Sequence, residues 1–373
     1  MKPVRFIIAP HTRKFYAGLH QFITTQHLHE QVQIEQVDWQ QLLPFMEAQR
    51  HQAGVIVAEA GTTWLKYLQQ EALIQPFSLT PSSPPIWSAR WIWDTRLLFY
   101  RRDHLRACGL DPADAFASLE QFRQTLSTLQ AAGYRTPLAL TTDATLQGMH
   151  YMSTWLWATG SDWLNADATQ VIFHEPAALA GIQAFYHLLP FMLDPGIPSS
   201  DHDQLMRFLE GHSSIFLSGR WGQRALEHRQ AGVARLPGAV FVGGTDLVVL
   251  HTTPGTTEAV EIAQRLIQSL TAPGTSRTFA ELAHMLPAHP QDQEAPWILN
   301  NPLSGVMQDA IATGRSFVPS SLWPIIEQPL PRVYSETWHE ISQDPDHLDD
   351  IVAQNYTRAA ETIQRMIEAS IPH

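Results

Sequence analysis

Hydrophobic and polar residues follow one another along the first part of the chain in blocks that predict strands and helices in turn. Residues 4–9 form a short apolar run, and residues 16–29 have apolar positions at helical spacing. Residues 32–37 then alternate between apolar and polar side chains, as a half-buried strand does. The predicted order is strand 4–9, helix 16–29, strand 32–37, helix 39–52, strand 54–58 and helix 63–73. This βαβ alternation predicts a mostly parallel sheet, with ligands expected at the carboxyl ends of its strands.

The rest of the chain mixes strands with a growing share of helices. The Pro- and Ser-rich residues 79–85 are typical of a surface connection, and residues 93–100 predict a strand able to cross between two domains. Gly133 is a good C-cap for the helix before it. The further predicted elements are helices 119–132, 149–159 and 177–189, strand 214–217 with a turn at 218–220, strands 239–242 and 247–250 on either side of 243–245, helices 258–270 and 275–284, and a last helix at 349–369.

Length and composition indicate a globular protein of two domains. A chain of 373 residues exceeds one ordinary core, and 44% hydrophobic residues with 16% charged ones supply enough apolar material for packing. The formal net charge of −12 argues against a nucleic-acid partner, because such binding relies on Lys and Arg. The single cysteine, Cys108, excludes an internal disulfide and a multi-thiolate metal site, and we expect it to be a small buried residue.

The first residues bear on localisation. The apolar run after Lys2 reaches a polar, charged stretch by residues 11–14, so it is too short for the core of a signal peptide. No apolar run approaches the roughly 20 residues that span a bilayer. As written, the sequence therefore predicts a cytoplasmic protein. A leader that was removed, or missed when the start was assigned, would instead place the protein in the periplasm or at the cell surface.

Catalytic signatures are absent from the sequence. It contains no glycine-rich dinucleotide fingerprint, no phosphate-binding loop and no His-Glu-x-x-His zinc motif. Residues 211–215 begin like a nucleophile elbow but lack its second glycine. Two groups of candidate metal ligands, at residues 27–30 and 201–203, are better interpreted as solvated surface, because adjacent residues on one element rarely converge on one ion. We therefore expect no catalytic residue, no cofactor and no metal.

Tryptophan is the residue type that points to a ligand. The chain has 12 tryptophans, several of them in predicted loops or at strand ends rather than on apolar helical faces. The C–H face of a pyranose ring stacks on an aromatic plane, while its hydroxyls need convergent polar groups to replace lost water. For any single tryptophan, a place in the core remains the commoner outcome.

Several blocks of sequence occur in an order that resembles a known family. Residues 94–103 have the sequence Asp-Thr-Arg-Leu-Leu-Phe-Tyr-Arg-Arg-Asp, and residues 208–221 run from Phe-Leu-Glu-Gly to Gly-Arg-Trp. The other blocks are 59–65 with 71–76, 119–122 with 129–133, 155–162, 243–245 and 319–323. In this order they resemble the bacterial extracellular solute-binding proteins (family 1) of carbohydrate ABC transporters, the group that includes maltose- and trehalose-binding proteins. The resemblance extends over nearly the whole chain.

The resemblance implies a type II periplasmic-binding-protein fold, in which two α/β lobes close on a small sugar in the cleft between them. The chain would cross between the lobes near residues 94–97, 239–242 and 300–303. The first lobe would comprise residues 1–96 plus 243–300, and the second residues 97–242 plus 301–373. The implied protein is a non-enzymatic monomer whose partners are a sugar and the permease subunits of an ABC importer.

The resemblance also implies a set of ligand-binding residues. Asp94 would accept hydroxyl hydrogen bonds, Arg315 would donate them, and Trp221 and Trp323 would stack on the sugar. The full expected set is Thr63, Trp64, Asp94, Trp221, Gly243, Gly244, Thr245, Arg315 and Trp323, followed by His11, Glu59, Trp91, His150 and Trp155.

Three departures from the family pattern keep other functions open. The sequence shows no leader, the loop at residues 10–14 lacks the usual acidic or Asn ligand, and His212 replaces a common lysine. A cytoplasmic sugar sensor or regulatory protein with the same fold is therefore the main alternative. A glycosidase is a third, and would use Glu59 or Asp94 as one of its two carboxylates.

Overall fold

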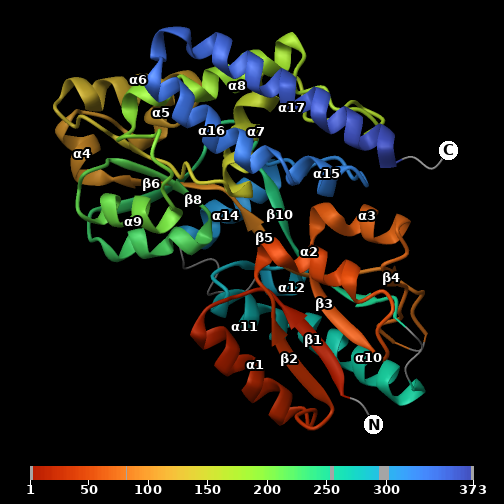
Figure 1. The fold of residues 1–373 in the computed structure, drawn as a ribbon. Coiled ribbons are helices and arrows are strands. Elements are labelled where there is room, and N and C mark those ends of the chain that lie inside the picture. The colour runs from red at the N-terminus through yellow and green to blue at the C-terminus, as the bar shows by residue number, and fades with distance from the viewer. Residues whose placement is uncertain (1–2, 81, 253–255, 294–301, 371–373) are drawn as a thin grey trace. The chain divides into compact units, whose positions relative to one another are not determined.

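The structure is a computed structural model that describes residues 3–80, 82–252, 256–293 and 302–370, and the chain divides into two compact units, each described by itself (Figure 1). Unit 1 comprises Met1–Asp94, Gly243–Asn300 and Pro319–Ser321, and unit 2 comprises Thr95–Val242, Asn301–Val318 and Leu322–His373. The first change of unit falls at 94/95, against 96/97 for the expected lobes. The expected crossing at 300–303 falls partly outside the described residues. That the units act as ligand-binding lobes stays a prediction.

Unit 1 is built on a mixed sheet. Its strands are β1 (Val4–Ile8), β2 (Val32–Gln36), β3 (Ile56–Gly61), β4 (Ile74–Gln75), β5 (Ala89–Thr95), β10 (Val242–Leu250) and β11 (Leu286–Pro287). Their order is β11-β5-β10-β3-β1-β2, with β4 also paired to β10. The strand β1 lies parallel to β2 and β3, as the βαβ pattern predicts, whereas β10 is antiparallel to β3. The prediction of a mostly parallel sheet therefore holds only for the N-terminal strands.

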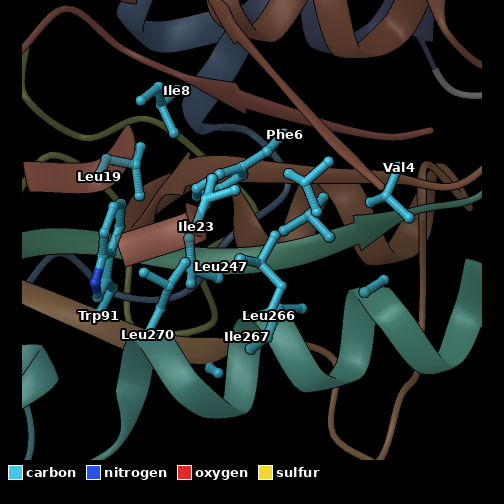
Figure 2. Packing of buried hydrophobic residues seen from close by; sticks show 14 of the residues in the cluster. Val4, Phe6, Ile8, Leu19, Ile23, Trp91, Leu247, Leu266, Ile267 and Leu270 are labelled. Carbon is cyan, nitrogen blue, oxygen red and sulfur yellow. The ribbon is translucent and has the colours of Figure 1, made fainter. Parts of the chain in front are cut away.

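Helices cover both faces of this sheet. They are α1 (Arg13–Thr25), α2 (Trp39–Ala48), α3 (Leu65–Gln70), α10 (Thr257–Thr271), α11 (Thr275–Leu282) and α12 (Pro290–Gln293), with a 3-10 turn η1 (Thr62–Trp64) before α3. Successive residues of a strand point to opposite faces, so Phe6 and Ile7 enter different cores. Phe6 packs in one core with Leu19 of α1 and Leu266 of α10 (Figure 2). Ile7 packs in the other with Leu42 of α2.

Unit 2 has a small sheet and many more helices. The sheet order is β7-β8-β6-β9, with β7 (Leu138–Ala139), β8 (Ile215–Ser218), β6 (Leu97–Arg101) and β9 (Ala231–Arg235). The helices are α4 (Arg102–Ala107), α5 (Pro112–Ala115), α6 (Leu119–Ala131), α7 (Leu146–Ala158), α8 (Pro176–Tyr186), α9 (Asp201–Leu209), α14 (Pro302–Thr313), α15 (Trp323–Glu327), α16 (Leu330–Gln343) and α17 (Leu348–Ser370), with 3-10 turns η2 (Leu189–Phe191), η3 (Arg220–Glu227) and η4 (Pro345–His347).

Aromatic residues fill the helical core of unit 2, and the polar ends of several are hydrogen-bonded. The hydroxyl of Tyr186 lies 3.0 Å from that of Tyr356 and donates to the carbonyl of Tyr334 at 3.1 Å. The indole of Trp163 donates to Ser153 at 2.8 Å. Buried Tyr and Trp need such partners, because an unmet buried donor loses its hydrogen bond to water without replacement. Burial raises the pKa of Tyr186 well above its usual value.

Three local predictions differ from the structure. The predicted strand 93–100 is two strands, β5 and β6, which belong to different sheets and are separated by Arg96. The predicted pair of strands around residues 243–245 is instead one continuous strand, β10. Cys108 is partly exposed at the end of α4 rather than buried.

Candidate functional site

In unit 1, polar side chains gather where the parallel strands end. Glu59, near the end of β3, is fully buried and accepts a hydrogen bond from the backbone N–H of Ala9, just after β1, at 3.0 Å. His11 Nε2 lies 3.1 Å from the same Glu59 oxygen. The His11 ring stacks on Phe15 with 4.2 Å between centroids. We call Ala9, His11 and Glu59 the Glu59 cluster.

The Glu59 cluster joins a buried carboxylate to an imidazole inside the unit. Burial opposes ionisation of Glu59, but the charge and hydrogen bond of His11 and the N–H of Ala9 outweigh it, so the pKa of Glu59 lies below its usual value. The carboxylate thereby fixes the loop that follows β1. A fully buried side chain with these partners holds its own loop in place rather than presenting oxygens to a ligand.

The glycines of β10 have a structural reason to be there. Gly244 has φ of +145°, and a Cβ on it would lie 2.1 Å from the carbonyl oxygen of Ile92 in β5. Only glycine permits both that backbone conformation and that approach of β10 to β5. Thr62 donates its hydroxyl to the Gly244 carbonyl at 3.1 Å. Gly243 is buried and Thr245 is partly exposed.

Of the other residues expected from unit 1, two keep exposed surface and two are packed. Thr63, in η1, and Asp94, in β5, are partly exposed. Trp64 is buried and stacks on Trp39 with 4.8 Å between centroids. Trp91 is fully buried in the core shown in Figure 2. Neither indole leaves a free face for stacking on a ligand.

In unit 2, a cluster of rings and charged groups surrounds Arg96. The guanidinium carbon of Arg96 lies 4.9 Å from the centroid of Trp221 and 5.3 Å from that of Phe241. The ring of His150 stacks on Phe241 with 3.8 Å between centroids and 2° between planes. Arg96 Nη2 donates to His150 Nδ1 at 2.5 Å. A cation held between aromatic faces in this way is stabilised by their quadrupoles.

His150 is neutral in this setting. Burial, and next the charge of Arg96, lower the pKa of His150 well below its usual value. Because Nδ1 accepts from Arg96, the proton of the neutral ring resides on Nε2.

A carboxylate completes this arrangement. Asp201, the first residue of α9, accepts hydrogen bonds from Ser218 Oγ at 2.9 Å and from Trp221 Nε1 at 3.0 Å. Burial raises the pKa of Asp201 to about 6, although Ser218, Trp221 and the charge of Arg96 favour the ionised form. The interpretation of residues 201–203 as solvated surface is therefore wrong for Asp201. We call Arg96, His150, Asp201, Ser218, Trp221 and Phe241 the Trp221 cluster.

The indole of Trp221 packs against the backbone of Gly219. Trp221 lies in η3 and is partly exposed. A Cβ on Gly219 would lie 2.1 Å from the Trp221 ring, so the ring rests directly against the glycine backbone. Contacts from Gly219, Arg96 and Asp201 thus orient an aromatic side chain that keeps part of its surface accessible.

Arg315 and Trp323 lie in unit 2 but have other partners. The guanidinium of Arg315 pairs with Asp162 at 2.5 Å and lies 5.2 Å from the centroid of Trp157, with its side chain 42% exposed. Trp323 is buried, stacks on Phe317 at 4.4 Å and donates its N–H to a backbone carbonyl. Trp155 is also buried, against the rings of Phe122 and Phe185. Trp323 is therefore a packed residue rather than a free stacking surface.

A pocket of about 420 Å³ lies beside Arg315 in unit 2. Its polar lining includes Asp162, Asn165 and Glu175, and Trp221 does not line it. Of its charged lining residues, Asp162 pairs with Arg315.

In residues 3–80, 82–252, 256–293 and 302–370, no three His, Cys, Asp or Glu side chains are grouped so that they could hold a metal ion. Over the same described ranges, no helix combines the length and the apolar character needed to cross a bilayer.

Sequence reasoning missed four members of the Trp221 cluster: Arg96, Asp201, Ser218 and Phe241. A signal existed for Arg96, because an arginine directly before the apolar residues 97–100 must find partners if the predicted strand is buried. No local signal existed for Asp201, since its partners lie 17 and 20 residues further along the chain.

Comparisons with known proteins give the fold. No family model matches the chain, and no curated protein matches it. The sugar-binding protein MalE from Xanthomonas citri is 18% identical and aligns over 100% of both chains with a TM-score of 0.76. An ABC transporter solute-binding protein from Thermotoga lettingae, bound with α-D-tagatose, is 14% identical over 98% of this chain and 100% of that one, with a TM-score of 0.77. The GacH receptor of Streptomyces glaucescens, described unliganded and with acarbose, is 13% identical over 97% and 99%, with a TM-score of 0.74. The chain therefore has the α/β type II periplasmic-binding-protein fold.

Proposed function

We propose that this chain binds a small carbohydrate without converting it, as the substrate-binding component of an ABC importer. The permease subunits of that importer would be its partners, and the periplasm or the cell surface its location. The sugar-binding descriptions of the structural neighbours support the proposal. The observation that carries it is the partly exposed indole of Trp221, held in place by Arg96 and Asp201.

The chemistry of the Trp221 cluster suits a sugar. An oriented indole offers a rigid apolar plane for the C–H face of a pyranose at little entropic cost. The neutral His150 supplies a polar group beside that plane, whereas Arg96 is buried and holds His150 and the indole in place. The carboxylate of Asp201 already accepts hydrogen bonds from Ser218 and Trp221. A few oriented polar groups around an aromatic surface are typical of small-molecule sites.

The residues that we propose for ligand contact are those with exposed surface. In unit 2 they are Trp221, His150 and Arg315, and in unit 1 they are Thr63, Asp94 and Thr245. The remaining expected residues would act through packing: Trp64, Trp91, Trp155 and Trp323 in the cores, Gly243 and Gly244 in β10, and His11 with Glu59 in their ion pair.

Calorimetry against a panel of mono- and disaccharides tests the proposal. We expect at least one sugar to bind, and Trp221→Ala to weaken it roughly tenfold or more, since one aromatic stack with its buried area contributes about 1.5 kcal/mol or more. Trp87→Ala is the matched control, because Trp87 is 41% exposed in unit 1 and belongs to neither cluster. The affinity of Trp87→Ala for the sugar should equal that of the wild type.

Two results would contradict the proposal. If no sugar in the panel binds, or if Trp221→Ala binds as tightly as the wild type, the Trp221 cluster is not the site. Chromatography of the sugar after long incubation addresses the enzymatic alternative, and any product would favour a glycosidase. For the importer role, a deletion strain should lose uptake of the labelled sugar and regain it with the wild-type gene but not with Trp221→Ala.

A further inference from the structure

Asp201 is held so that its carboxylate faces the interior of unit 2. Ser200 caps α9, and its hydroxyl and backbone exchange hydrogen bonds with Asp203, which fixes the first turn of the helix. The carboxylate of Asp201 turns instead to Ser218 and Trp221. Two aspartates on the same helical turn therefore have different partners. Asp203 forms the capping box with Ser200, and Asp201 accepts a hydrogen bond from an indole.

The Trp221 ring depends on Asp201 for one of its three restraints. Gly219 supports the ring from its own segment, and Arg96 lies over it at 4.9 Å. Neither contact fixes how the ring is rotated in its own plane. The hydrogen bond from Nε1 to Asp201 at 3.0 Å does, because it ties one atom at the edge of the indole to a fixed acceptor.

The charged and titratable groups around Asp201 come from several elements. Arg96, between β5 and β6, attracts the carboxylate, and Asp143, before α7, repels it. On α9 itself, His202 and Asp203 are exposed. Ser218 of β8 is a neutral donor. Burial dominates this balance and raises the pKa of Asp201 to about 6.

We propose that Asp201 is the positioning residue of Trp221, and that protonation of its carboxylate loosens the indole and weakens ligand binding there. The ligand half of this statement rests on the proposed function. The ionised carboxylate makes a charge-assisted hydrogen bond to Nε1–H, about twice as strong as a neutral one. The neutral acid keeps an acceptor oxygen but loses that charge and its attraction for Arg96.

The first experiment needs no ligand. In a ¹H–¹⁵N spectrum of the indole N–H groups, the Trp221 signal is identified by its loss in Trp221→Phe. We expect this signal to shift with pH with a midpoint near 6 in the wild type, and to stay constant in Asp201→Asn, which imitates the protonated side chain. A Trp221 signal that ignores pH in the wild type, or that still titrates in Asp201→Asn, overturns the proposal.

A second variant covers the case in which Asp201→Asn does not fold. Ser218→Ala keeps the carboxylate and removes a donor that favours its ionised form. The midpoint of the Trp221 signal should then move to higher pH. A midpoint equal to that of the wild type would show that the signal does not report on Asp201.

The second experiment uses the sugar that calorimetry identifies. The affinity of the wild type should fall as the pH is lowered through about 6, whereas Asp201→Asn should be roughly tenfold weaker at neutral pH and independent of pH in this range. If a sugar binds at Trp221 equally well at every pH, the positioning role fails and the function stands. If no sugar binds but the indole titrates, the function fails and the positioning of Trp221 by Asp201 stands.

Discussion

A carboxylate stands at the centre of both the Glu59 cluster and the Trp221 cluster, and the two carboxylates have opposite pKa shifts. Glu59 faces His11 and a backbone N–H, and its pKa is lowered. Asp201 faces two neutral donors, Ser218 and Trp221, and burial raises its pKa to about 6. Burial alone therefore does not decide the charge of an acid. The direction of the shift depends on the balance between burial and the bonded partners, which differs between the two carboxylates.

The contrast distinguishes a carboxylate that keeps its charge from one whose charge changes with pH. Glu59 stays ionised through the pH range of most environments and holds the loop after β1. Asp201 changes charge within that range, next to the one indole that is both oriented and partly exposed in its cluster. The same comparison suggests four measurements.

The largest effect is expected from Glu59→Gln. Removing one partner of a buried ion pair leaves the other uncompensated and typically costs about 3 to 5 kcal/mol of unfolding free energy. Here the substitution would leave His11 without its carboxylate. Denaturant unfolding followed by circular dichroism measures the loss. Glu336→Gln is the control, because the ion pair of Glu336 with Arg332 is exposed and should contribute about 1 kcal/mol or less.

The dependence on pH gives this variant a second test. A lowered pKa means that the stabilisation by Glu59 is present above its unfolded value of 4.5 and is lost as the pH falls through the lower folded value. The wild type should thus lose stability on acidification, and Glu59→Gln should lose less. Equal acid sensitivity of the two proteins would mean that Glu59 and His11 do not form an ion pair.

The second largest effect, expected from Asp201→Asn, is a gain of stability rather than a loss. The pKa of Asp201 is raised, so its contribution to stability is present below 3.8 and is lost as the pH rises through about 6. Asp201→Asn carries no such charge and should be more stable than the wild type above pH 6, by up to about 3 kcal/mol for a shift of roughly two pH units. Thermal unfolding at a series of pH values measures this difference.

Asp203→Asn is the matched control on the same helix. The pKa of Asp203 is lowered, first by its hydrogen bond with Ser200, so neutralising it should cost about 0.5 to 1 kcal/mol rather than add stability. If Asp201→Asn loses as much stability as Asp203→Asn, the carboxylate of Asp201 is solvated. Its pKa would then not be raised, and the contrast with Glu59 would be wrong.

A smaller loss of stability is expected when a methyl group is added at Gly219, against which the Trp221 ring packs. Gly219→Ala places a methyl group in the space of the indole ring and should cost about 1 to 3 kcal/mol as Trp221 shifts. It should also move the indole N–H signal of Trp221, because the bond to Asp201 is lost. Gly305→Ala is the control: a Cβ there meets nothing within 4 Å in helix α14, so its stability should be equal or higher. Equal stability of the two variants would show that Trp221 is free to move.

Local patterns in the sequence predict much of the fold. The apolar run at residues 4–9 and the alternation at 32–37 correspond to β1 and β2, because a strand in a covered sheet needs apolar residues on both faces. The helix predicted at 119–132 is α6, since its apolar spacing and the glycine after it act within one turn. The single strand predicted at 93–100 failed because an apolar run does not show where a chain changes sheet.

The candidate site is harder to predict, because its contacts join distant parts of the chain. The resemblance to solute-binding proteins indicated Trp221 and His150, yet their shared partner Arg96 was missed. The polar run at 201–203 looks like an ordinary helix start, which it is for Asp203. Asp201 differs only because η3 brings Trp221 onto it. A sequence pattern records what a residue is, whereas its pKa depends on neighbours that folding supplies.

The smallest effect is expected from Ser218→Ala, and it tests most directly whether Asp201, unlike Glu59, changes its charge with pH. Ser218→Ala removes a neutral donor that favours ionised Asp201, and should cost about 1 kcal/mol above pH 6 and little well below it. In an Asp201→Asn background the cost should no longer depend on pH, because the charge that Ser218 stabilises is absent. Ser153→Ala is the control, since Ser153 bonds only neutral groups, the indole of Trp163 and a carbonyl. A pH-independent cost for Ser218→Ala in the wild type would mean that Asp201 does not change its charge over this pH range in the folded protein.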